Sequence, residues 1–260
     1  SQITPSGDFS VPVGAVQVAW FENPHERSGH YVKDLVFEVL PPQALAEEES
    51  AREPRRDASF PNTEINVRRF ELECEVMRQG MERLARREPT PVCFFDGSLI
   101  VSFVAQMKPS LRSRYIDAVE GVLATSQRTR VPLVGYVDNS RATDMVSMLA
   151  HLCSLGSAPI ISDGALLRRM MQWGQRSEAW ICDRDDSLFR EGMEAERYYY
   201  DKMLFLYLKT SSENAPARLE MPRWLLDAGL VDRVTDVVRA ECVVGTGYPY
   251  TVETADAVAV

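Results

Sequence analysis

The sequence predicts an α/β fold in which helices flank a mixed central sheet. Apolar runs at Pro91–Asp96, Leu99–Val104 and Pro132–Asp138 are typical of buried strands. A helical repeat of apolar residues separates the last two runs, so strands and helices alternate along the chain. The first two runs are joined by a tight-turn sequence, Asp96-Gly97-Ser98. We therefore expect a hairpin there, and a sheet that is not purely parallel.

The first 61 residues are predicted to form a less regular N-terminal extension to a domain that covers residues 62–260. Tyr31–Leu40 alternates apolar and polar residues, which indicates a strand. Pro41–Pro61 is rich in Glu, Arg and Pro and is expected to be an exposed loop.

The remaining elements follow from apolar periodicity. Phe70, Met77 and Leu84 recur at heptad spacing and predict the first long helix. Helices are expected at Asn62–Arg87, Pro109–Arg128, Arg141–Leu152, Gly164–Trp173 and Leu230–Val243, with a short last helix after Pro249. Further strands are expected at Trp180–Cys182 and Met203–Leu208.

Composition limits the classes of function. With 29 basic and 38 acidic residues, the net charge is −9. This is a poor composition for a protein that coats nucleic acid, although an enzyme with a local basic groove is compatible with it. Five dispersed cysteines indicate a reducing cytoplasm rather than a disulfide scaffold or a zinc site. No run approaches the roughly 18 apolar residues of a membrane helix, and no basic-then-apolar leader is present.

Several common catalytic signatures are absent from the sequence. There is no GxxxxGK[ST] phosphate loop, so the chain is not itself a P-loop ATPase. Gly245-Thr246-Gly247 does not continue as a dinucleotide fingerprint, and no GxSxG elbow occurs. The three histidines show no HExxH pairing. These absences direct attention to the carboxylates.

Two aspartates each end an apolar strand. A carboxylate held rigidly at the end of a buried strand suits a hard divalent cation. Asp96 can equally be a hairpin-turn residue, and Asp138 can equally belong to the helix cap Asp138-Asn139-Ser140. Because both strands end in aspartate, the interpretation as a metal site is favoured, and adjacent strands would bring both side chains to one edge of the sheet.

Two further carboxylates interrupt apolar helix faces. Glu120 lies between the two aspartates and shares its face with Ile116 and Leu123, although a surface ion pair is an alternative. Asp256 lies on the last helix, where an acid in the first turn also suits the helix dipole. The order Asp, Glu, Asp, Asp on strand, helix, strand and helix is RNase H-like. Such sites bind two divalent ions that activate water and stabilise the leaving oxygen of a phosphodiester.

At this point the sequence resembles the NurA nucleases, with a style close to the bacterial members. The matching blocks lie between residues 91 and 260, and they are Phe95-Asp96-Gly97-Ser98-Leu99, Val134-Gly135-Tyr136-Val137-Asp138-Asn139-Ser140-Arg141, Gly247-Tyr248-Pro249-Tyr250 and Ala255-Asp256.

The resemblance implies an RNase H-like core that holds two manganese ions, with magnesium as a possible substitute. Asp96 and Asp138 match the first and second metal-binding aspartates of the family, and Glu120 matches its helical glutamate. Tyr248 matches a tyrosine near the site. Asp256 stands where many members carry histidine, and it is expected to act as an oxygen ligand.

The resemblance also implies an activity and partners. It implies 5′-to-3′ exonuclease and single-strand endonuclease activity on DNA in double-strand break repair. The expected partners are DNA, a HerA-type hexameric ATPase and a second copy of the chain, with no membrane. Two alternatives are another RNase H-like phosphodiesterase that acts on RNA, and an inactive adaptor that docks on the ATPase ring.

Overall fold

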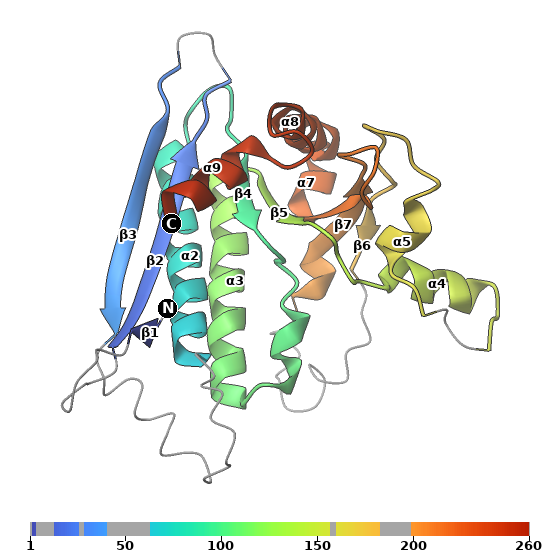
Figure 1. Cartoon of the computed structure of the whole chain (residues 1–260), viewed down its shortest axis with the longest axis horizontal. Helices are drawn as coiled ribbons and strands as arrows, with labels where there is room; N and C mark the ends of the chain where they lie inside the picture. Colours follow the sequence, from blue (N-terminus) through green and yellow to red (C-terminus); the bar gives the residue numbers. More distant parts are fainter. Residues whose placement is uncertain are drawn as a thin grey trace.

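Two β-sheets organise the computed structural model of the chain (Figure 1), which describes residues 2–3, 13–25, 29–40, 63–156, 160–182 and 199–259. The central sheet has five strands in the order β4-β5-β8-β7-β6. The bounds of its strands are β4 Cys93–Asp96, β5 Leu133–Val137, β6 Trp180–Ile181, β7 Met203–Leu208 and β8 Ala217–Pro222.

The central sheet is mixed, as the sequence predicts. β4 and β5 are parallel, whereas β8 runs antiparallel to both β5 and β7, and β6 runs antiparallel to β7. Every residue of β7 and β8 is buried, as expected for strands covered on both faces. The sheet and its flanking helices form an α/β, RNase H-like core.

The predicted hairpin after Asp96 is wrong. Leu99–Val104 forms no strand, and the chain instead continues through a loop into the 3-10 helix η1, Ser102–Gln106. Gly97 has φ +117°, and its N–H donates to Tyr136 O of β5 at 3.0 Å, so the loop passes over the sheet. Leu99 is fully buried in the core, although it belongs to no strand. A short apolar run in a sequence does not distinguish a buried strand from a buried loop.

Helices cover both faces of the central sheet. Their bounds are α2 Thr63–Leu84, α3 Pro109–Thr129, α4 Asp144–Leu152, α5 Asp163–Leu167, α7 Trp224–Asp227, α8 Val231–Val244 and α9 Tyr250–Ala259. The long helices α2 and α3 lie side by side in Figure 1 and pack on the face of β7 that carries Phe205 and Tyr207. The opposite face of β7, with Leu204 and Leu206, packs with residues of α8.

Two of the predicted helices have different ends in the structure. The helix expected at Gly164–Trp173 ends at Leu167. Met170 and Trp173 lie beyond this end and are exposed, so they do not form the buried face of a longer helix. The helix expected from Arg141 begins at Asp144. Asp163 accepts hydrogen bonds from the N–H groups of Met145 and Val146, so it satisfies the start of α4.

A second sheet precedes α2 and is more regular than the sequence predicts. Its strands are β1 Gln2–Ile3, β2 Val13–Glu22 and β3 Val32–Leu40, in the order β1-β2-β3. β3 was predicted, but β2 was not. Val16 and Val18 of β2 pack with Ile65 and Leu72 of α2. On the other side of the strand, Gln17 donates to Ala259 O of α9 at 3.0 Å.

The second sheet belongs to the predicted N-terminal extension, residues 1–61, and packs against the predicted domain. β2 contacts both α2 and α9, so the described part of the extension lies against the domain rather than apart from it. The loop predicted at Pro41–Pro61 lies outside the described residues. Within the parts of the chain that the structure describes, no helix is long and apolar enough to cross a bilayer.

Candidate functional site

Asp96 and Asp138 lie at the same edge of the central sheet. β4 pairs with β5 in parallel register, with Asp96 opposite Tyr136, and Asp138 follows the last residue of β5. The strand residues Phe95 and Tyr136 are buried, whereas both aspartates are exposed. The two apolar runs therefore hold a pair of carboxylates at one solvent-facing edge, as the sequence predicts.

Tyr248 joins this edge from the segment between α8 and α9. Its hydroxyl donates to Asp96 Oδ1 at 3.1 Å, and its ring packs edge-on against Tyr136 with centroids 5.1 Å apart. Burial raises the pKa of Tyr248 well above its usual value, and the negative charges of Asp96, Asp256 and Asp138 raise it further. The phenol therefore lies in the field of three carboxylates.

Asp256 comes to the edge on α9. Its side chain is exposed, and partial desolvation together with the charge of Asp96 raises its pKa. The first turn of α9 is held by Glu241 of α8, which accepts a hydrogen bond from the Thr251 N–H at 2.7 Å. The position predicted from the family blocks is thus placed beside Asp96 by the anchoring of the last helix.

Glu73 of α2 joins Asp96, Asp138 and Asp256 as the fourth carboxylate of this edge, and it is absent from the residues predicted from the sequence. Burial raises the pKa of Glu73 to about 7; Arg69, 3.5 Å away, opposes the rise, whereas the charges of Asp96 and Asp256 add to it. A signal was available, because Glu73 lies three residues after Phe70 and four before Met77. It therefore interrupts the apolar face of α2, the same signal that singled out Glu120.

Glu120 lies midway along α3 and is half-buried. The charges that shift the pKa of Glu73 at the acidic edge come from Arg69, Asp96 and Asp256, and Glu120 is not among them. The structure thus brings four predicted residues to one edge, Asp96, Asp138, Tyr248 and Asp256. The role of Glu120 as a ligand stays a prediction.

The donor set at this edge fits a hard divalent cation. Its side chains offer carboxylate and phenol oxygens, which magnesium and manganese prefer. Burial raises the pKa values of Glu73 and Asp256, and the negative charge of Asp96 raises both of them further. No three His, Cys, Asp or Glu side chains among the described residues already stand at the spacing of bound ligands.

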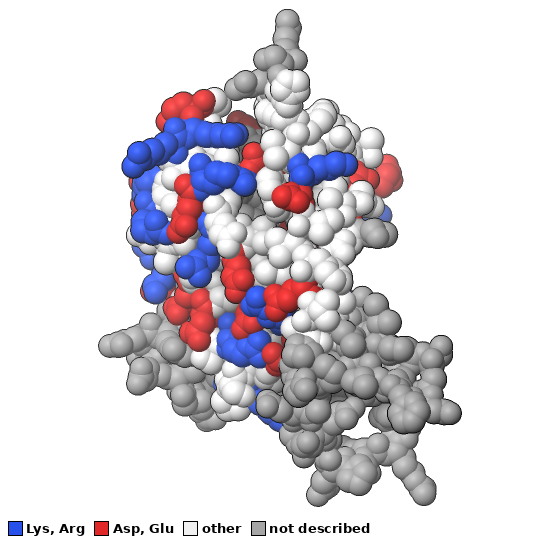
Figure 2. Space-filling view, turned by 90° about the vertical axis from the view of Figure 1, so that its left-hand side faces the viewer, with Lys and Arg blue, Asp and Glu red and all other residues white. Residues whose placement is uncertain are grey.

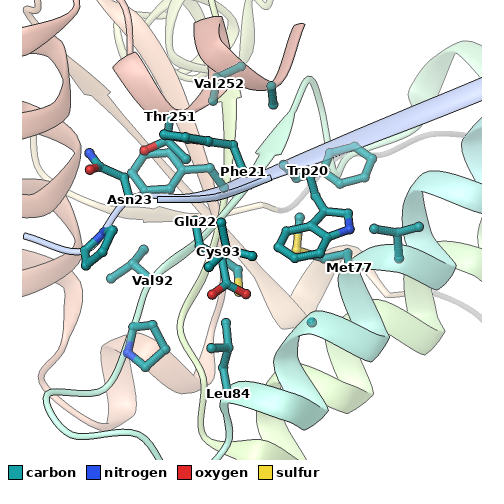
Figure 3. A pocket seen from close by; sticks show the side chains of 18 of the residues that line it. Trp20, Phe21, Glu22, Asn23, Met77, Leu84, Val92, Cys93, Thr251 and Val252 are labelled. Atoms are coloured by element: carbon teal, nitrogen blue, oxygen red, sulfur yellow. The ribbon is translucent and has the colours of Figure 1, made fainter. Parts of the chain in front are cut away.

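A cavity of about 690 Å³ opens beside the carboxylates, between β2, α2, β4 and α9. Glu73, Asp96 and Asp256 line one part of it. Figure 3 shows another part, where Trp20 lies above Met77 of α2 and Glu22 points towards the middle of the cavity. The second sheet and α9 thus form walls of a hollow that reaches the acidic edge.

A second cavity of about 1170 Å³ lies on the Asp138 side of the edge. Ser98, Asp138 and Arg141 line it, and its lining includes the buried pair Arg218 and Glu220 of β8. The loops that follow β4 and β5 therefore separate two hollows, and each hollow contains one of the strand-end aspartates.

Fold and site together define a class of protein: an RNase H-like α/β protein whose candidate site is built from carboxylates rather than from histidine or cysteine.

Comparison with descriptions of protein families gives the particular family. The NurA domain matches residues 1–260, the whole of the sequence, and the chain belongs to the NurA family. This is a family of nucleases that act in DNA end processing. Comparison with curated proteins and with solved structures gives no match.

Proposed function

We propose that the protein is a manganese-dependent DNA nuclease that resects the ends of double-strand breaks, with 5′-to-3′ exonuclease and single-strand endonuclease activity. One observation carries the proposal, which is that the parallel strands β4 and β5 bring Asp96 and Asp138 to one edge of the sheet, where the Tyr248 hydroxyl donates to Asp96 at 3.1 Å. Membership of a nuclease family supports the same conclusion.

The site residues have separate roles in this proposal. Asp96, Asp138, Glu120 and Asp256 would hold two divalent cations, which when bound would activate water and stabilise the charge on the leaving oxygen. Tyr248 restrains the carboxylate of Asp96 through its hydroxyl proton. The same hydroxyl can donate to a phosphate oxygen when the carboxylate turns towards a cation. No residue needs to form a covalent bond with DNA.

The electrostatics of the surface favour a partner that delivers DNA. The net charge is −9, and Figure 2 shows acidic side chains among the basic ones on the described part of the face that it presents. Arg68 and Arg114, for example, are paired with glutamates. Because much of a protein's affinity for duplex DNA comes from Lys and Arg side chains that neutralise phosphates, we expect this protein to bind duplex DNA weakly and in a salt-sensitive way.

We further propose that a HerA-type hexameric ATPase supplies the motor and that the nuclease works as a homodimer in the cytoplasm. The chain has no nucleotide phosphate loop of its own, and docking on a translocase would raise the local concentration of DNA at the site. All five cysteines are free thiols, which suits a reducing compartment.

The test of the activity uses end-labelled single-stranded DNA, blunt duplex DNA and RNA of the same sequence. Each substrate is incubated with manganese, magnesium or a chelator. We expect manganese-dependent cleavage of DNA that the chelator abolishes. Cleavage of RNA alone would favour the RNase H-like alternative, and no cleavage of any substrate would favour the inactive adaptor.

The test of the motor compares resection of blunt duplex by the nuclease alone, with the ATPase and ATP, and with the ATPase and a non-hydrolysable analogue. We expect stimulation only with ATP. Equal resection in all three reactions would refute motor dependence, and stimulation by the analogue alone would indicate docking without translocation.

A further inference from the structure

A buried ionic network lies beneath the acidic edge. Its centre is the pair Arg218 and Glu220 of β8, whose side chains are 1% and 2% exposed. Arg218 Nε donates to Glu220 Oε1 at 2.7 Å, and the guanidinium stacks on the ring of Phe205, 3.9 Å from its centroid. A buried ion pair is commonly no more stable than a well-packed apolar pair, so stability alone does not explain these charges.

Glu220 holds the loop that follows Asp96. Its Oε2 accepts hydrogen bonds from the Ser98 hydroxyl at 2.8 Å and from the N–H groups of Leu99 at 2.8 Å and Ile100 at 2.9 Å. These donors lie two to four residues after Asp96. One carboxylate oxygen thus fixes the whole turn by which the chain leaves β4.

The absence of a side chain at Gly135 allows this contact across the sheet. Gly135 of β5 stands opposite Phe95 of β4 on one side and Glu220 of β8 on the other. A Cβ atom at position 135 would lie 2.8 Å from the carbonyl oxygen of Gly97 and 3.0 Å from Leu99 Cγ. The loop can therefore cross directly over β5 and reach Glu220.

Arg218 holds the segment that follows Asp138. It stands opposite Val137, the residue before Asp138, and its Nη1 donates to Asp144 Oδ2 at 2.7 Å, at the start of α4. Nη1 also donates to the Tyr207 hydroxyl at 3.2 Å, which in turn donates to Asp163 at 2.7 Å. The connection between β5 and α4 is thus fixed at both of its ends.

We propose that Arg218 and Glu220 are positioning residues of the nuclease, which set the separation of the Asp96 and Asp138 carboxylates by tying both of their loops to one strand. The inference rests on the proposed metal-dependent cleavage. Neither residue needs to touch DNA or a cation. Two-metal sites need ions about 3.5–4 Å apart, and a displacement of their ligands by a fraction of an ångström lowers the rate.

The first test replaces the pair together, as Arg218→Met with Glu220→Leu in the full chain. No unpaired charge then remains on β8, and Asp144 stays near the helix N-terminus, which favours an anion. We expect cooperative unfolding to persist. We also expect kcat on single-stranded DNA to fall by about 10- to 100-fold with KM within about 2-fold, and the manganese concentration for half-maximal rate to rise.

A second readout does not depend on cleavage. Hydrogen exchange of the Leu99 and Ile100 amides in the metal-free protein should accelerate in the double variant, because both amides lose their acceptor. The matched control is Arg68→Met with Glu38→Gln, which removes the 2.8 Å ion pair between α2 and β3. This control should leave kcat and both amides unchanged.

Conservative replacement separates positioning from folding if the double variant does not fold. Glu220→Gln keeps an oxygen acceptor for the loop amides and should retain most of the rate, whereas Glu220→Ala should lose it. Equal rates in these two variants, or a folded double variant as active as the wild type, would overturn the positioning role. A wild-type protein without metal-dependent cleavage would instead refute the proposed function.

Discussion

Two glutamates, Glu241 and Glu73, line the same cavity, and their pKa values are shifted in opposite directions. Glu241 of α8 is 1% exposed and accepts hydrogen bonds from Asn23, His25 and Thr251. Burial alone would raise its pKa, but these hydrogen bonds outweigh burial and leave the pKa below its usual value. This end of the cavity uses a charge to hold β2, α8 and α9 together.

At the other end, Glu73 of α2 has a single nearby cation, Arg69 at 3.5 Å. Burial and the charges of Asp96 and Asp256 raise its pKa to about 7. Here burial and the neighbouring acids outweigh the opposing charge of Arg69. The cavity therefore has two different corners. The corner built for stability, around Glu241, holds neighbouring elements together through hydrogen bonds. The repulsive corner, around Glu73, Asp96 and Asp256, brings carboxylates close enough for their charges to repel each other, as functional sites commonly do.

The largest effect should come from removing a charge at the repulsive corner. Asp96→Asn is nearly isosteric, so the fold should persist, but a cation loses its main anchor. We expect cleavage to fall by more than about 100-fold, since even residues behind the ligands cost 10- to 100-fold, and Asp138→Asn should behave alike. The rate is measured with manganese on single-stranded DNA.

The control for this prediction is Asp232→Asn on α8, which removes an equally isosteric charge from an exposed ion pair with Arg176. It should leave the rate unchanged. Full activity in a folded Asp96→Asn protein would contradict the two-metal proposal.

The corner built for stability should respond in free energy of unfolding rather than in chemistry. Glu241→Ala leaves the donors of Asn23 and Thr251 without their acceptor, so we expect a loss of about 2–4 kcal/mol. Urea denaturation measures it. Because the pKa of Glu241 is lowered in the folded state, its contribution is present above the usual carboxyl pKa and disappears as the pH falls through the folded value. A loss that is the same at every pH would contradict this assignment.

Glu120 tests whether the repulsive corner extends to α3. If Glu120 is a ligand, Glu120→Gln should raise the manganese concentration for half-maximal rate by about 10-fold and lower the rate. If it only forms a surface ion pair, the change costs about 0–1 kcal/mol of stability and catalysis is untouched. A manganese titration of the rate distinguishes the two, and an unchanged curve would assign Glu120 to the surface.

Asp256 tests the departure from the family pattern. Imidazole is also a good ligand for manganese, so Asp256→His should retain activity within roughly 10-fold of the wild type. Asp256→Ala should be much weaker. The opposite order, with the alanine variant active and the histidine variant dead, would show that the position holds no cation.

The smallest effect should be a gain in stability at the repulsive corner. A raised folded pKa means that Glu73 contributes its full stability below a pH of about 4.5 and loses it as the pH rises towards 7. In the presence of a chelator, Glu73→Gln should therefore unfold at higher urea than the wild type at pH 8, and at equal urea at pH 4. The gain should be on the order of 1 kcal/mol, because the Glu73 side chain is 32% exposed. A destabilised variant at pH 8 would show that the charge is already compensated.

The strand-end aspartates could be predicted because their strands are visible as apolar runs. Val92–Phe95 and Pro132–Val137 contain no charge, so the acid that ends each run stands out. Tyr248 could be identified only through the family blocks, whereas Asp256 also interrupts an apolar helix face, and no local pattern indicates that α9 returns to β4. The hydrogen bond from Tyr248 to Asp96 joins residues 152 positions apart.

The errors share a physical cause, which is that partners distant in sequence decide burial. β8 was missed because Arg218 and Glu220 interrupt its apolar pattern, and their burial is tolerable because they pair with each other, with Asp144 and with the loop that follows β4. β2 was missed because its alternation of buried and polar residues reflects contacts with α2 on one side and α9 on the other. The hairpin was wrong because Leu99–Val104 is apolar for core packing, not for a sheet.

The anchoring of α9 has a consequence for the order in which the protein assembles. The helix that brings Asp256 contacts β2, and Gln17 and Ala259 meet across 242 positions of sequence. Contacts between such distant segments close large loops and form late in folding. If Asp256 is a metal ligand, as proposed, the complete set of carboxylates therefore forms only once α9 has packed against β2.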